Sequence, residues 1–167
     1  RTVGFVFQQI NLLPHLTLLE NVALPGLNNR DPRQRRRAVE RAEELLTAVG
    51  LSHAMRRGPR QASGGEQQRA AIARALVTDP VVLFADEPTG ALHSAAGQAV
   101  LDLMEETNAS GQTTVMVTHD PRAAARGHKV IYLRDGGIVG TLTTALTGTS
   151  LADRETRVRD WLQEMGW

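Results

Sequence analysis

The chain has 167 residues, of which 41% are hydrophobic and 22% charged, the composition of a globular protein with one domain-sized core. Its formal net charge of +1 gives no overall electrostatic reason to expect binding to nucleic acid or to an anionic membrane. The absence of cysteine excludes disulfides, thiol catalysis and zinc–thiolate sites, and no apolar run is long enough to span a bilayer.

The first predicted element is a strand over residues 2–7, an apolar segment that is followed directly by Gln8. A glutamine at a strand end is usually a polar loop residue. A helix is predicted over residues 32–49, with Asp31 as its N-cap, a proline in its first turn and a buried stripe of apolar residues at helical spacing from Ala38 to Val49. Its arginine cluster has acidic neighbours at i+4 spacing and no accompanying aromatic residues, so a solvated charged face is favoured over nucleic-acid binding.

The most informative stretch begins with Ser63-Gly64-Gly65-Glu66, which opens a helix. Ser63 can cap this helix, and Glu66 can bond back to the backbone of the cap, which together make a capping box. Exposed N–H groups at a helix N-terminus preceded by glycine also form an anion site. Taken alone, these four residues favour an ordinary capped helix over a phosphate site.

The stretch continues with an apolar run over residues 81–85 that ends in Asp86 and Glu87. Five apolar residues in a row are typical of a strand buried on both faces of a parallel sheet, and ligands bind at the carboxyl end of such strands. One carboxylate there suits Mg²⁺, and a second can orient or deprotonate a water molecule. The alternative for these two residues alone is a solvated acidic pair.

The next predicted elements are a helix capped by Ser94 that runs to about Asn108, and a buried strand over residues 113–118 with His119 at its end. A lone histidine is usually structural. Here, however, it would end a strand parallel to the Asp86 strand, at the same edge of the sheet.

The C-terminal part is predicted to contain a hairpin, a linker and a helix. The hairpin strands span residues 129–133 and 138–142 around an Asp-Gly-Gly turn. Residues 141–149 are interpreted as a Thr-rich linker. An amphipathic helix over residues 151–165, capped by Ser150, would then close the core or pack on a partner.

In this order, the motifs resemble those of the ATP-binding cassette (ABC) ATPases over nearly all of residues 1–142. SGGEQQR is similar to the signature motif, VVLFADE to the Walker B strand and TVMVTHD to the H-loop. FVFQQINLLPHLTLLENV resembles the Q-loop with its following helix. NLLPHLTLLENVALP followed by SGGEQQR is most similar to bacterial subunits of the lipoprotein-release and macrolide-export type.

The resemblance implies catalytic and metal-binding roles for four residues. Asp86 would hold Mg²⁺ through water, and Glu87 would polarise the attacking water. Gln8 would contact Mg²⁺ or that water, and His119 would contact the γ-phosphate of ATP. Catalysis of this kind depends mostly on positioning and on stabilisation of charge.

The resemblance also implies that the signature turn closes over ATP held by the opposite subunit, through Ser63, Gly64, Gly65 and Glu66. A dimer of ATPase subunits, with like or unlike partners, is therefore expected. One departure is Ala62, where the family usually has leucine; another is that the usual glutamine is Glu66. Neither change removes the serine hydroxyl or the glycine N–H group that would meet a phosphate.

The expected fold class is α/β: a mostly parallel, P-loop NTPase-like sheet with helices on both faces and an inserted helical subdomain around residues 10–75. Residues 1–142 would be a partial ABC ATPase domain, and residues 143–167 a linker and C-terminal helix. No G-x-x-x-x-G-K-[ST] phosphate loop occurs in the sequence. We therefore expect the fold to be incomplete at the N-terminus, with this Walker A loop upstream of Arg1.

The function expected from the resemblance is that of the ATP-binding subunit of an ABC transporter, on the cytoplasmic face of the membrane, working with a membrane permease. One alternative is a non-catalytic or regulatory fragment, favoured by His93 at the position of the D-loop aspartate and opposed by Glu87 and His119. The other is an ABC ATPase that acts on DNA or ribosomes, but no coiled-coil insertion or duplicated cassette is visible. Because histidine takes up a proton near neutral pH, His93 would make dimer closure depend on pH.

The missing phosphate loop has a consequence for nucleotide binding. We expect the 167-residue chain alone to bind Mg-ATP poorly, because it lacks the lysine and the backbone cradle that hold the β- and γ-phosphates in P-loop proteins. Calorimetric titration of the isolated chain with Mg-ATP measures this affinity. A micromolar dissociation constant would contradict the prediction.

Overall fold

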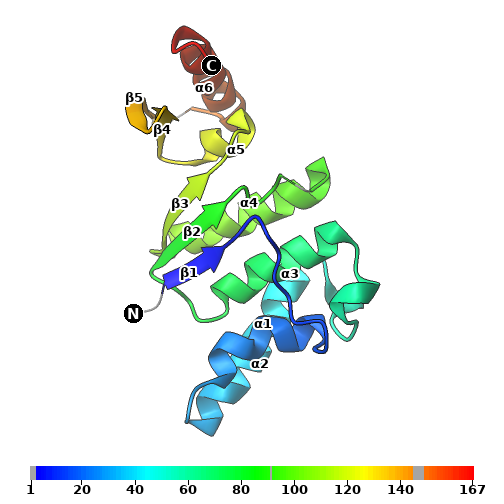
Figure 1. Ribbon diagram of the computed structural model, residues 1–167. Helices are drawn as coiled ribbons and strands as arrows, with labels where there is room; N and C mark the ends of the chain where they lie inside the picture. The colour runs from blue at the N-terminus through cyan, green and yellow to red at the C-terminus, as the bar shows by residue number, and fades with distance from the viewer. Residues whose placement is uncertain (1–2, 91, 145–148) are drawn as a thin grey trace. The chain divides into compact units, whose positions relative to one another are not determined.

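The computed structural model describes residues 3–90, 92–144 and 149–167 (Figure 1). The chain divides into two compact units, Arg1–Val117 and Thr118–Trp167. Each unit has a sheet of its own: β1–β2–β3 in the first and β4–β5 in the second. Among the described residues, none of the helices is both long and apolar enough to cross a bilayer.

The described residues of the first unit form three parallel strands, four α-helices and two short 3₁₀ turns. In chain order these are β1 (Val3–Val6), α1 (Leu18–Leu27), α2 (Pro32–Ala48), the 3₁₀ turns Ser52–Ala54 and Pro59–Gln61, α3 (Gly64–Leu76), β2 (Val82–Asp86), α4 (Ser94–Ala109) and β3 (Thr113–Val117).

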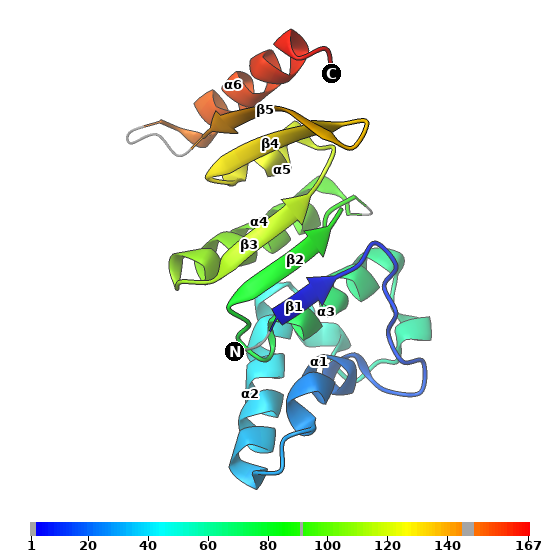
Figure 2. The ribbon, with the colours of Figure 1, turned by 60° about the vertical axis from the view of Figure 1, so that its left-hand side comes forward.

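The three strands of the first unit lie side by side in the order β1–β2–β3, and both pairings are parallel (Figure 2). The register sets Val6 opposite Ala85, and Asp86 opposite Val117. The carboxyl ends of all three strands therefore meet at one edge of this sheet, which is the edge where parallel sheets bind ligands.

One face of this sheet is covered by α3 and α4, and its core side chains include Val6, Leu83 and Ala85. On the opposite face Phe5 and Phe84 stack with ring centroids 5.4 Å apart, yet they are 52% and 42% exposed. The prediction that the run over residues 81–85 is buried on both faces is therefore wrong for the described residues. Successive side chains of a strand point to opposite faces, and the described helices cover only one of them.

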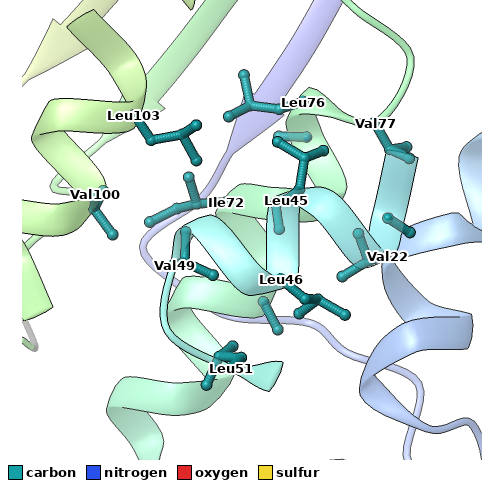
Figure 3. Close-up of a cluster of buried hydrophobic side chains, with 14 of the residues drawn as sticks. Val22, Leu45, Leu46, Val49, Leu51, Ile72, Leu76, Val77, Val100 and Leu103 are labelled. Atoms are coloured by element: carbon teal, nitrogen blue, oxygen red, sulfur yellow. The ribbon is translucent and has the colours of Figure 1, made fainter. Parts of the chain in front are cut away.

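A large apolar cluster joins α2, α3 and α4, and it is drawn in Figure 3. Leu45 and Leu46 of α2 and Ile72 of α3 are completely buried in it, and Val100 and Leu103 of α4 reach it from the other side. Apolar residues at helical spacing predicted this buried stripe of α2. The N-cap of α2 is also confirmed: the Asp31 side chain accepts the backbone N–H of Arg33.

The second unit packs the terminal helix on a hairpin (Figure 2). Its elements are α5 (Pro121–Arg126), β4 (Lys129–Arg134), β5 (Gly137–Thr143) and α6 (Leu151–Glu164). Val158 and Leu162 of α6 are buried, and Trp161 meets Tyr132 of β4 edge to face with centroids 6.5 Å apart. The sequence left two roles open for this helix, closing a core or packing on a partner. In the structure it closes the core of the second unit.

The hairpin prediction is confirmed in its strands and in its turn. Asp135 and Gly136 have φ angles of +51° and +77°, the left-handed pair that a two-residue hairpin turn of type I′ requires. The predicted linker began too early, because Thr141–Thr143 belongs to β5, whose pairing with β4 continues to Lys129. Residues 145–148 of that linker lie outside the described residues. The family-based division at residue 142 stays a prediction.

The close packing of α3 on β1 generates a testable contrast between two glycines. A Cβ atom on Gly4 would stand 2.7 Å from the carbonyl oxygen of Ala75, whereas one on Gly97 would meet Thr89 at an ordinary 3.7 Å. We expect Gly4→Ala to lower the free energy of unfolding by about 1–3 kcal/mol through overpacking. Gly97→Ala, inside α4, should raise it by up to about 1 kcal/mol through helix propensity.

Urea unfolding of the two variants beside the unchanged chain measures both effects. A Gly4→Ala variant as stable as the original chain would show that α3 does not approach β1 so closely.

Candidate functional site

The carboxyl edge of the first sheet brings together three of the predicted site residues. Asp86 is the last residue of β2, and Glu87 follows it. Gln8 lies two residues beyond Val6, which is paired with Ala85. The side chains of Gln8 and Asp86 are exposed and that of Glu87 is half-buried, so this edge offers one amide and two carboxylates.

The backbone of Glu87 has a left-handed conformation, with a φ angle of +47°. Its N–H group donates to the carbonyl oxygen of Val117 at 2.9 Å, and its own carbonyl accepts the N–H of Gly90 at 3.2 Å. A non-glycine residue in this region stores strain of about 1–3 kcal/mol, and such residues gather at functional sites. The β2 strand therefore ends in a tight turn that sets the direction of the Glu87 side chain.

The donor groups at this edge fit a magnesium ion that is held partly by phosphate. Asp86 provides an exposed carboxylate at the end of β2. Among the described residues, no three His, Asp or Glu side chains gather closely enough to hold a metal ion by themselves. Mg²⁺ commonly keeps several waters and takes only one or two protein carboxylates beside substrate phosphates.

The signature turn has the capping box predicted from the sequence. The Ser63 hydroxyl accepts the N–H of Glu66 at 3.3 Å, and the Glu66 carboxylate accepts the N–H of Ser63 at 2.7 Å. Ser63 and Gly64 are exposed, and a Cβ atom on Gly64 would meet nothing within 4 Å. The turn therefore combines an open approach with the positive end of the α3 dipole, which suits an anion.

Glu66 has a second partner that the sequence analysis missed. Its Oε1 atom lies 3.0 Å from Nε2 of His53, in the 3₁₀ turn Ser52–Ala54. The N–H of Ser63 lowers the pKa of the Glu66 carboxyl below its ordinary value, and the Ser63 hydroxyl and His53 act in the same direction. The Glu66 carboxylate therefore interacts with the N–H group of its own N-cap residue and with His53.

A further polar residue of α3 was missed although its spacing gave a signal. Gln68 is only 2% exposed, and its Nε2 atom donates to the carbonyl oxygen of Pro88 at 3.3 Å. It lies four residues before Ile72 and therefore on the buried stripe of the helix. Helical periodicity distinguishes it from Gln67, which is half-buried and bonds to Ala62.

The N-cap of α4 corrects the sequence analysis. Ser94 was expected to cap this helix, but the cap is His93, whose Nδ1 atom accepts the N–H of Ala96 at 3.5 Å. Ser94 is instead the first residue of the helix. The histidine thus takes a position where aspartate is among the preferred residues. Ala91, in the segment expected to lead into the D-loop, lies outside the described residues.

His119 follows the last residue of β3 by two positions and belongs to the second unit of the structure. The strand before it is confirmed as Thr113–Val117, but the prediction that it is buried is wrong, because Val115 and Val117 are 45% and 60% exposed. The next residue, Asp120, is the N-cap of α5 and accepts the N–H of Arg122 at 2.9 Å. The role expected for His119 stays a prediction.

Comparison with known proteins gives one family. The family model described as ABC transporter matches residues 1–90. The lipoprotein-releasing system ATP-binding protein LolD of Aquifex aeolicus is 48% identical over 143 residues, which are 86% of this chain and 63% of that protein. The macrolide export ATP-binding/permease protein MacB 1/2 of Paracoccus denitrificans is 50% identical over 143 residues, 86% of this chain and 21% of that protein.

Among solved structures, the chain is similar to the dimeric post-hydrolysis state of the ATP-binding cassette MJ0796 bound to ADP and Pi. The TM-score is 0.77 and the identity 41%, over 86% of this chain and 63% of that one. The α/β fold with a parallel sheet is therefore shared with this cassette. The chain spans less than two thirds of the length of each of these relatives.

The unusual cap of α4 generates a prediction about stability. We expect His93→Asp to raise the free energy of unfolding by about 0.5–1 kcal/mol, because aspartate is a preferred N-cap and the present bond is long.

Urea unfolding at pH 8 measures this gain. His15→Asp, which makes the same exchange at an exposed loop residue, is the matched control. An equal gain from both substitutions would attribute the effect to charge and not to the cap.

Proposed function

Because the chain belongs to the ABC transporter family, we propose that it is part of an ATP-binding subunit that hydrolyses ATP to drive transport by a membrane permease. The observation that carries the proposal is Glu87, fixed in a left-handed turn directly after Asp86 at the carboxyl end of β2. Such a pair supplies a metal-binding carboxylate and a base at the edge where parallel sheets bind ligands.

In the proposed reaction, each of the four predicted residues has a role of its own. Asp86 would hold Mg²⁺ through water, and the ion would offset the charge of the phosphates. Glu87 accepts a proton from the attacking water. Gln8 contacts Mg²⁺ or this water, and His119 contacts the γ-phosphate.

The signature turn binds the triphosphate of a second subunit in this proposal. Ser63 offers its hydroxyl, and Gly64 and Gly65 offer backbone N–H groups at the N-terminus of α3. Glu66 caps the turn with one carboxylate oxygen, and the other oxygen faces His53. Two ATPase subunits, alike or different, are therefore needed, as in the dimeric cassette to which the chain is similar.

The longer protein is proposed to complete this site and to locate it in the cell. Residues 1–142 are assigned to the ATPase domain, with a helical subdomain around residues 10–75, and residues 143–167 to a linker and terminal helix. The names of the relatives support a lipoprotein-release or macrolide-export type. We propose that the subunit is bound to its permease at the cytoplasmic face of the membrane.

The assigned base gives a sharp test in the full-length protein. Glu87→Gln keeps the size of the side chain but cannot take a proton, so we expect turnover to fall by about 100-fold or more. ATP binding should survive, and the ATP-bound dimer should accumulate in size-exclusion chromatography.

The matched control is Glu43→Gln, the same exchange on the exposed face of α2, which should leave turnover unchanged. Near-normal turnover of Glu87→Gln, or a dimer that fails to form with ATP, would remove Glu87 from the role of base.

A further inference from the structure

Gln68 is a buried amide on the apolar face of α3. It is 2% exposed and shares its helix face with Ile72 and Ala75, both of which are in the core. A buried amide is costly unless it forms hydrogen bonds, so its position is defined by the partner it finds. That partner is the carbonyl oxygen of Pro88, 20 residues away in the chain and 3.3 Å from Nε2.

Pro88 is the residue directly after Glu87, and it is also buried. Its ring fixes the φ angle, so a bond to its carbonyl restrains the direction of the whole segment that follows the base. The turn is restrained at two further points, by the bond from Glu87 N–H to Val117 and by the bond from Gly90 N–H to the Glu87 carbonyl. Of these three hydrogen bonds, the one from Gln68 is donated by a side chain, and the other two join backbone groups.

The left-handed backbone of Glu87 makes these restraints necessary. Strained conformations persist only where the surrounding structure fixes them from several directions. Loss of one restraint allows the turn to relax, which would move the carboxylate away from its place at the end of β2. A displacement of about 1 Å in a reacting group can cost 100-fold in rate.

We propose that Gln68 is a positioning residue for Glu87, acting through the carbonyl group of Pro88. This inference rests on the proposed function, since it takes Glu87 as the base. It also links two parts of the site, because the helix that carries Gln68 begins at the signature turn with Ser63. The same helix, α3, therefore supports the signature turn, which meets the nucleotide of the second subunit, and also the base of its own subunit.

The test uses the full-length protein with Gln68→Met, which keeps the length and volume of the side chain but cannot donate. We expect kcat to fall by about 10–100-fold with KM for ATP within about twofold, and the ATP-bound dimer to accumulate. The matched control is Gln67→Met, which also removes one amide bond, to the carbonyl of Ala62 at 3.1 Å, without touching Pro88. Its kcat should stay within about twofold of the original protein.

Hydrogen exchange provides a readout that does not depend on activity. In Gln68→Met, peptides that contain the amides of Glu87 and Gly90 should exchange at least about tenfold faster, whereas Gln67→Met should leave them unchanged. Gln68→Asn, whose amide is too short to reach Pro88, should behave in the same way and serves if the methionine variant does not fold.

The outcomes separate the two proposals. Unchanged exchange and unchanged kcat in the Gln68 variants would overturn the positioning role, as would equal losses in the Gln67 and Gln68 variants. An original full-length protein that hydrolyses no ATP would overturn the proposed function instead, and the exchange experiment would still decide whether Gln68 holds the turn.

Discussion

The close approach of α3 to β1 is the constraint on which the candidate site depends. The backbone of Ala75 comes so near to Gly4 that a single added methyl group would stand 2.7 Å from its carbonyl oxygen. Small residues make this possible. Ala70, Ala71 and Ala73 of the same helix are buried, and their short side chains allow the helix to pack close to its neighbours. The helix is thereby fixed to the strand that leads to Gln8.

Three separate contacts then start from this one helix. At its N-terminus, Ser63 and Glu66 form the cap that leaves the first turn open to an anion. In its middle, Gln68 holds the carbonyl of Pro88. Near its C-terminus, the Arg74 guanidinium donates to the carbonyls of Ile10 and Asn11 at 3.2 and 2.7 Å, which restrains the segment after Gln8. Signature turn, base and Q-loop segment therefore share a single rigid support.

Charge is placed around the signature turn in a way that serves an anionic ligand. A carboxylate in the first turn of a helix stabilises the helix but competes with a phosphate for the same N–H groups. Glu66 avoids this conflict because one oxygen accepts the cap N–H and the other faces His53. The cap bond of the Glu66 carboxylate comes from the N–H group of Ser63 and not from those of Gly64 or Gly65.

The sequence by itself determined the elements and motifs whose signals are local: the capping box at Ser63, the N-cap at Ser150, the buried stripe of α2, and the Asp-Gly turn of the hairpin. Only the tertiary structure decided that His93 caps α4, that Phe84 lies on an uncovered face of the sheet, and that Gln68 and Arg74 reach segments 20 and 64 residues away. A cap or a turn forms among residues within one helical turn of each other, so its residue types reveal it. Which partner a buried amide finds, and which face of a strand is covered, depends on how distant elements pack, and periodicity gives the direction of a side chain but not what lies there.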